Sequence, residues 1–167
     1  MFNVGQIIIY TTYGICKIDS LIQKDFNGQT FDYYVLKPLN NDKTSLLVQV
    51  NNPITLSKLK QLLSKDEALE LIQSIPQIDS TWIENDNERK RVFTDIIRNG
   101  ERKKIISIIK SVYNHQKILK EKGRKLHSID DQFYKDAEKI IYDELSYVLE
   151  IDKADVIGFI TNTLEAN

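Results

Sequence analysis

Up to about Asn52, hydrophobic and polar positions alternate in short runs that are rich in β-branched and aromatic residues. Such runs, with a period of two, are typical of strands. They cover residues 6–11, 15–22, 31–39 and 45–50. Four or five short strands with no helical periodicity between them predict a small barrel of the SH3-like or Tudor-like kind.

Turn residues separate these runs. Asn27-Gly28 readily supplies the positive φ angles that a tight hairpin turn requires. Asn40-Asn41-Asp42 marks the next turn, and Pro38 is expected at a strand end because it cannot donate to a ladder.

From Pro53 onward the period changes to about 3.6, which predicts helices. The first residues at this spacing are Ile54, Leu56, Leu59, Leu62 and Leu63. The chain is therefore expected to be α+β, with a barrel over residues 1–53 and a helical bundle over residues 54–167.

Helix boundaries are marked by familiar signals. Ser64 and Glu67 form a capping box for a helix over 66–75, which Pro76 ends. Asn99-Gly100 ends a second helix that contains Val92, Phe93, Ile96 and Ile97, and Gly123 ends a third. Ser128 with Asp131 is expected to cap a fourth, and Asp152 and Asp155 open a short last one.

The net charge of −1 hides segments of opposite sign. Residues 81–127 contain 13 Lys and Arg against 6 Asp and Glu, a net of +7, and residues 128–167 contain 3 against 10, a net of −7. This pattern fits a surface that faces a polyanion. It fits equally well two helices whose opposite charges face each other.

Candidate catalytic and metal-binding residues are few. His115 and His127 are the only histidines, have no metal-ligand spacing, and are expected at the surface. Cys16 is the only cysteine and is expected in the core of a strand. The carboxylates at Asp130-Asp131 and Asp143-Glu144 are expected to be solvated or to cap a first turn. We therefore expect neither an enzyme nor a cofactor or metal.

Trp82 stands in the basic segment and is the only tryptophan. It could be a hydrophobic staple that packs onto the bundle. It could also be a wedge that unstacks a distorted base step while nearby cations hold the backbone. The cations nearest in sequence are Arg89, Lys90, Arg91, Arg98, Arg102, Lys103 and Lys104. A second basic group, around Gly123, consists of Lys117, Lys120, Lys122, Arg124 and Lys125.

The chain resembles the CarD/CdnL family of bacterial RNA polymerase-binding transcription regulators. The N-terminal half carries the resemblance through Phe2-Asn3-Val4-Gly5, Ile9-Tyr10, Tyr13-Gly14-Ile15, Tyr34-Val35-Leu36 and Leu47-Val48-Gln49-Val50. This half is similar to the Tudor-like polymerase-interacting module that is also found in transcription-repair coupling factor. The helical half carries the resemblance through Trp82, Arg89-Lys90-Arg91, Asn99-Gly100 and the stretch from Asp131 to Glu144.

The resemblance implies a mechanism. The barrel would dock on the lobe of the polymerase β subunit, and the helical domain would lie on promoter DNA at the upstream edge of the melted bubble. Trp82 would then be wedged into the minor groove and would stabilise the open complex. The implied DNA-contacting set is Trp82, Arg89, Lys90, Arg91, Arg102, Lys103, Lys104, Lys122, Arg124 and Lys125.

The resemblance also implies polymerase-contacting residues on the strands. Lys24 stands near one basic position of the family, whereas Leu47 occupies the other, so the polymerase contact is expected to be rearranged. Val48 and Gln49 complete the implied set. A competing hypothesis is a protein-only adaptor whose basic bundle docks on an acidic partner.

The location expected from the sequence is the cytoplasm, in association with polymerase and the nucleoid. Residues 1–10 lack the basic n-region of a signal peptide, and Ile7 to Ile9 is too short to cross a bilayer. We expect a monomer, since no coiled-coil heptad is present.

Overall fold

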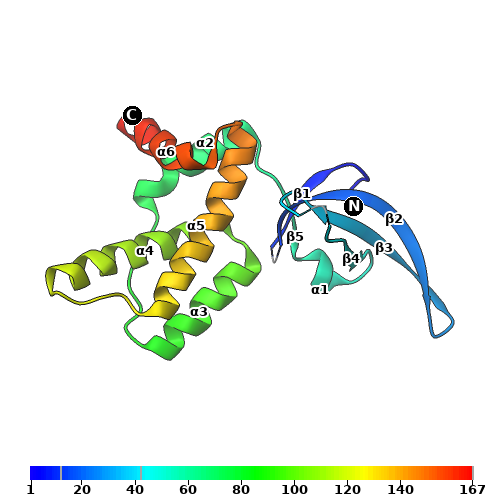
Figure 1. Ribbon diagram of the computed structural model, residues 1–167, viewed down its shortest axis with the longest axis horizontal. Helices are drawn as coiled ribbons and strands as arrows, with labels where there is room; N and C mark the ends of the chain where they lie inside the picture. Colours follow the sequence, from blue (N-terminus) through cyan, green and yellow to red (C-terminus); the bar gives the residue numbers. More distant parts are fainter. Residues whose placement is uncertain (12, 42, 167) are drawn as a thin grey trace. The chain divides into compact units, whose positions relative to one another are not determined.

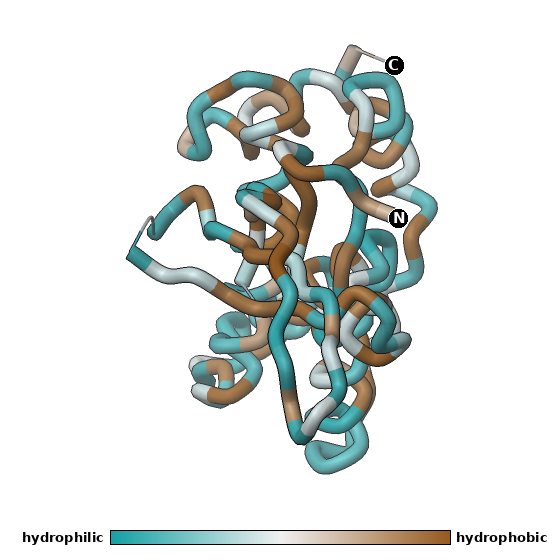
Figure 2. The backbone as a smooth tube through the Cα atoms, turned by 90° about the vertical axis from the view of Figure 1, so that its right-hand side faces the viewer, coloured by the Kyte–Doolittle hydropathy of each residue, from teal (hydrophilic) through white to brown (hydrophobic). Residues whose placement is uncertain are grey.

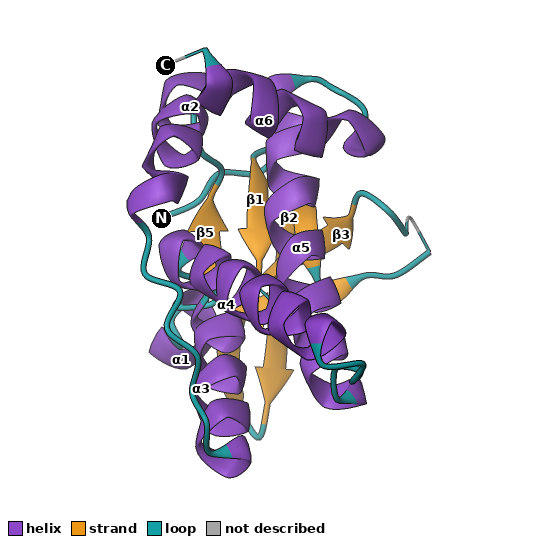
Figure 3. Cartoon of the chain, turned by 90° about the vertical axis from the view of Figure 1, so that its left-hand side faces the viewer, coloured by secondary structure: helices purple, strands orange, loops and turns teal. Residues whose placement is uncertain are grey.

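The computed structural model describes residues 1–11, 13–41 and 43–166 of the chain. They divide into two compact units, one of Met1–Leu62 and a second that begins at Leu63 (Figure 1). The strands, orange in Figure 3, all belong to the first unit, and the long helices, drawn in purple, all belong to the second.

The first unit is built on a five-stranded antiparallel sheet in the order β4-β3-β2-β1-β5. Its strands are β1 (Ile7–Tyr10), β2 (Gly14–Phe26), β3 (Gln29–Pro38), β4 (Leu46–Gln49) and β5 (Leu59–Gln61). The four predicted strands are thus confirmed, and β3 ends at Pro38 as expected. Asn27 and Gly28 join β2 to β3 with φ angles of 50° and 79°, as predicted. The turn at Asn40-Asn41-Asp42 includes Asp42, which lies outside the described residues.

The sequence predicted that the helical part of the chain begins at Pro53. This prediction is confirmed for one helical turn and is wrong for the residues that follow it. Only α1 (Pro53–Leu56) is helical, and β5 then pairs with β1, with Leu59 opposite Tyr10. Leu59 is buried in the core of the sheet, which favours a strand along the open edge of β1. The units consequently divide after Leu62, nine residues beyond the predicted boundary at residue 53.

The sheet is open and not a closed barrel. β4 and β5 lie at its two edges, and no pairing joins them in the part of the chain that the structure describes. Residues from all five strands form one core, with Ile8, Ile18 and Leu36 fully buried. The Tyr34 hydroxyl donates to the Phe2 carbonyl oxygen at 3.0 Å and fastens the N-terminal segment to this core.

The second unit is helical, so the α+β class is confirmed. Its helices are α2 (Lys65–Ser74), α3 (Asp86–Asn99), α4 (Arg102–Glu121), α5 (Ser128–Leu149) and α6 (Val156–Glu165), with short 3₁₀ turns at Ile75–Gln77 and Lys153–Asp155. Hydrophobic and hydrophilic residues alternate along these helices (Figure 2). Each helix thus buries one side, and Ile105, Ile108 and Leu145 are among the fully buried residues.

The predicted helix ends at Ser64 and at Gly100 have the expected geometry. Ser64 and Glu67 form the complete capping box of α2. Gly100 ends α3 in the left-handed conformation with φ 69°. The predicted cap of α5 is wrong, because Ser128 is already its first helical residue and His127 precedes it without a side-chain cap.

Candidate functional site

Trp82 lies in the segment of residues 78–85, which connects the 3₁₀ turn at Ile75–Gln77 to α3. Its indole is half-buried and stacks on the imidazole of His115, with ring centroids 3.8 Å apart and planes within 4°. The guanidinium carbon of Arg89 lies over the indole at 4.2 Å from its centroid. The indole therefore packs onto the bundle, but against an imidazole and a guanidinium, where a staple would use an apolar residue.

Both histidines were expected at the surface; His127 is exposed, whereas His115 is half-buried. Burial lowers the pKa of His115 below its usual 6.5, and the charges of Arg89 and Lys122 act in the same direction against Glu84 and Asp130. Sequence spacing could not reveal this pair, since 33 residues separate Trp82 from His115.

Arg89 is buried, with only 3% of its side chain exposed. Its Nε and Nη2 donate to the two carboxylate oxygens of Asp130 at 2.9 Å, and Nη2 also donates to Asp86 at 2.8 Å. Its Nη1 donates to the Ile83 carbonyl oxygen at 2.8 Å. A guanidinium with these partners cannot reach a phosphate, which removes Arg89 from the DNA-contacting set. Asp130 lies in the first turn of α5, one of the two expected positions, but it is buried and not solvated.

Like Arg89, Arg102 forms a two-bond ion pair with a carboxylate of α5, toward the other end of the unit. Its Nε and Nη2 donate to the Glu144 carboxylate at 2.7 Å each, and Glu144 also accepts from the Leu63 N–H at 3.0 Å. Glu144 is buried, contrary to the sequence expectation. The basic and acidic segments therefore face each other at Arg89–Asp130 and at Arg102–Glu144, as the second interpretation of the charge pattern proposed.

The other predicted DNA-contacting cations are exposed, and those that lie on or just after α4 form two groups. Lys103 and Lys104 lie in the first turn of α4, where Lys104 pairs with Glu101 at 2.7 Å. Lys122, Arg124 and Lys125 follow the other end of α4, and none of them forms an ion pair with another described residue. The rise of α4 separates Lys103 from Lys122 by about 28 Å.

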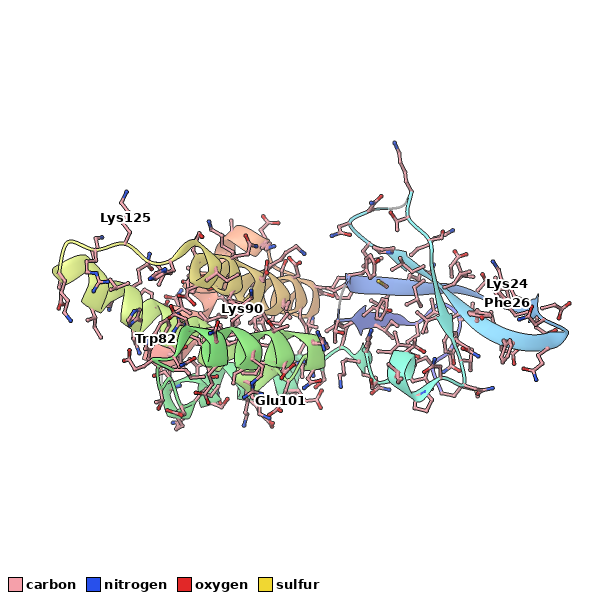
Figure 4. All side chains as sticks on the ribbon, turned by 90° about the horizontal axis from the view of Figure 1, so that it is seen from below. Lys24, Phe26, Trp82, Lys90, Glu101 and Lys125 are labelled. Atoms are coloured by element: carbon pink, nitrogen blue, oxygen red, sulfur yellow. The ribbon has the colours of Figure 1, made fainter. Side chains whose placement is uncertain are left out.

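Trp82 lies at the Lys122 end of α4, since it stacks on His115 and the charge of Lys122 acts on that histidine. Figure 4 shows Trp82 and Lys125 toward one end of the helical unit and Glu101 toward the other. We call Trp82, Lys122, Arg124 and Lys125 the tryptophan cluster. On α3, Lys90 is exposed, and Arg91 makes a long contact of 3.8 Å with Asp95.

Lys103 and Lys104 instead line an open cavity of about 430 Å³, together with Asp79 and Thr81. Two hydrogen bonds from Thr81 hold the pKa of Asp79 below its usual value, so the cavity contains a carboxylate as well as two ammonium groups. This mixture of charges is a weaker site for a phosphate than the tryptophan cluster.

The four predicted polymerase-contacting residues lie on β2 and β4. Leu47 pairs with Val35 and Gln49 with Tyr33, whereas Lys24 pairs with Phe31. Residues 31, 33 and 35 of one strand share a face, so Lys24, Leu47 and Gln49 share that face, which we call the outer face. Val48 points the opposite way into the core, where it is 1% exposed. β4 is an edge strand, so its backbone also borders this surface.

Other candidate chemistry is sparse in the described part of the chain. Cys16 is fully buried on β2, and burial raises its pKa to about 11. Among the described residues, no group of three or more His, Cys, Asp or Glu could hold a metal ion. None of the described helices combines the length and the apolar character needed to span a bilayer.

Comparison with known families bears on the first unit. Residues 2–60 match the family model of the CarD-like/TRCF RID domain, which is an RNA polymerase-interacting domain and not an enzymatic one. The match runs from the N-terminal segment through all of α1 to the second residue of β5. A search among curated proteins gave no match. Residues 2–60 are therefore similar to the CarD-like/TRCF RID domain family, which supports the resemblance stated from the sequence.

Proposed function

We propose that the chain is a two-part regulator of transcription initiation. The sheet unit binds the lobe of the polymerase β subunit, and the tryptophan cluster contacts promoter DNA at the upstream edge of the melted bubble. The observation that carries the proposal is a polymerase-interacting domain joined to a separate unit whose one tryptophan lies toward the same end as a group of exposed cations.

The outer face supports the polymerase contact. Leu47 is 44% exposed on an edge strand, beside Gln49 and on the same face as Lys24. An edge strand with an apolar side chain and open backbone groups suits addition of a partner strand, in which backbone bonds give affinity and side chains give specificity. Val48 contributes through its backbone, because its side chain is in the core.

Leu47→Asp tests this contact in the full chain. A carboxylate at the centre of the contact must be desolvated without a partner, so capture of core polymerase should fall at least tenfold. Ile54→Asp is the matched control, because Ile54 is also an exposed apolar residue, 72% exposed, but lies on α1. Equal capture by both variants would contradict the outer face as the polymerase contact.

The tryptophan cluster supports the DNA contact. A flat apolar ring beside cations can occupy an unstacked base step while the cations neutralise phosphates. Such binding shifts the equilibrium between closed and opened DNA. The size of the shift equals the difference between the protein's affinities for the two states. Tethering through the polymerase raises the local concentration of the cluster, so weak intrinsic DNA binding is sufficient.

Forked DNA separates this function from the adaptor hypothesis. The full chain should bind a forked duplex more tightly than a closed one, with an affinity that falls steeply with salt because condensed counterions are released. Trp82→Ala should remove the preference for the fork. Tyr147→Ala is the control, since Tyr147 is an exposed aromatic residue, 44% exposed, near the far end of α5. Salt-independent binding, or none, would favour a protein-only adaptor.

A further inference from the structure

The segment that carries Trp82 has no helix or strand, yet α4 holds it at several points. The Lys110 ammonium donates to the carbonyl oxygens of Ile75 and Ile78 at 2.8 and 2.5 Å. One turn further along α4, the Asn114 amide donates to the Ser80 hydroxyl at 3.3 Å. These bonds fix the backbone on the N-terminal side of Trp82.

Arg89 fixes the segment on the C-terminal side of Trp82. Its bond to the Ile83 carbonyl oxygen attaches the residue that follows the tryptophan, and its guanidinium also lies over the indole. Arg89 cannot itself move freely, because Asp130 of α5 and Asp86 of α3 hold the same guanidinium. The contact over the indole is therefore set by two helices.

His115 completes the arrangement by stacking on the indole with nearly parallel planes. If the indole were simply exposed to solvent, the connecting segment would not need the contacts that His115 and Arg89 make with it. A side chain that is ordered before binding, however, loses less conformational freedom when it binds.

We propose that His115 and Arg89 are positioning residues that hold the indole of Trp82 in one fixed orientation before the protein meets DNA. This inference rests on the proposed function, in which Trp82 enters an opened base step. It assigns Arg89 a role inside the protein, in place of the phosphate contact expected from the sequence.

The fluorescence of the single tryptophan tests the stacking directly and without DNA. A protonated imidazolium that stacks on an indole quenches its emission. Because the pKa of His115 lies below its usual 6.5, emission should fall as the pH is lowered from about 8 to about 5, mainly in the acidic part of this range. His115→Phe keeps a flat ring but cannot be protonated, and its emission should be independent of pH over this range. His127→Phe, at the other and exposed histidine, should titrate like the wild type.

Binding to forked DNA then tests the consequence for function. His115→Ala removes the stacking ring, which should release the indole to the quencher acrylamide and weaken fork binding about two- to tenfold, the range expected for one aromatic contact. His115→Phe should restore most of the affinity. Far-UV circular dichroism and thermal unfolding establish that both variants remain folded.

The outcomes separate the two proposals. If Trp82→Ala binds the fork as tightly as the wild type, the proposed wedge is wrong. If Trp82→Ala weakens binding while His115→Ala releases the indole and leaves binding unchanged, the wedge stands and the positioning role is wrong. An emission titration that persists in His115→Phe would also overturn the positioning role.

Discussion

The two ends of α4 carry similar runs of basic residues, but the fold uses them differently. At the N-terminal end, Glu144 holds Arg102 and Glu101 pairs with Lys104. At the C-terminal end, Lys122, Arg124 and Lys125 form no ion pair with another described residue, and Trp82 lies toward the same end of the unit. Cations at the C-terminal end are also favoured by the helix dipole. The comparison teaches that a count of basic residues does not identify a nucleic-acid surface until their partners are known.

Removing the partner of Arg102 should have the largest effect on stability. Glu144→Gln leaves a half-buried guanidinium without its carboxylate, and breaking such a pair costs about 3–5 kcal/mol in the free energy of unfolding. Urea denaturation measures this change. Glu150→Gln is the matched control, because Glu150 pairs with Lys65 at the surface and should cost less than about 1 kcal/mol. Similar costs for the two variants would contradict a structural role for Arg102.

The next largest effect is expected in DNA binding. The basic groups at the two ends of α4 should contribute to it differently. Lys122→Gln with Lys125→Gln should weaken binding to forked DNA and reduce the slope of log affinity against log salt by about 2, one for each lost phosphate contact. The double variant Lys103→Gln with Lys104→Gln removes the same charge from the opposite end of α4. Fluorescence anisotropy at several salt concentrations compares the two. An equal loss of slope would mean that DNA covers both ends of the helix.

The smallest expected effect concerns Asp86, at the Trp82 end. A hydrogen bond and the charge of Arg89 hold its pKa below the usual 3.8. Because the folded-state pKa is the lower one, the carboxylate stabilises the fold above 3.8, and this contribution is lost as the pH falls through the folded-state pKa. Thermal unfolding of wild type and Asp86→Asn should therefore differ near neutral pH and converge in strong acid. A constant difference across this range would contradict the contact with Arg89.

Local sequence signals predicted the local structure well. The capping box at Ser64, the left-handed Gly100 and the Asn27-Gly28 hairpin all depend on neighbouring residues, and all have the predicted geometry. The strand β5 was missed because its apolar spacing also fits a helix, and only the open edge of β1 decides between the two.

Long-range contacts around the site could not be predicted in the same way. Asp130 and Glu144 have the neighbours of ordinary solvated carboxylates in sequence, yet each meets an arginine that lies 41 or 42 residues away. His115 was assigned to the surface for the same reason. Its place in the basic segment and the resemblance to a known family both singled out Trp82, and the structure adds the residues that hold it.

The lifetime of a promoter open complex is the measurement that tests the central claim most directly. With polymerase and the full chain, the wild type and Tyr147→Ala should extend this lifetime, whereas Trp82→Ala should lose the extension and still bind polymerase. If Trp82→Ala extended the lifetime as much as the wild type does, the account of Trp82 as the element that contacts opened DNA would be wrong.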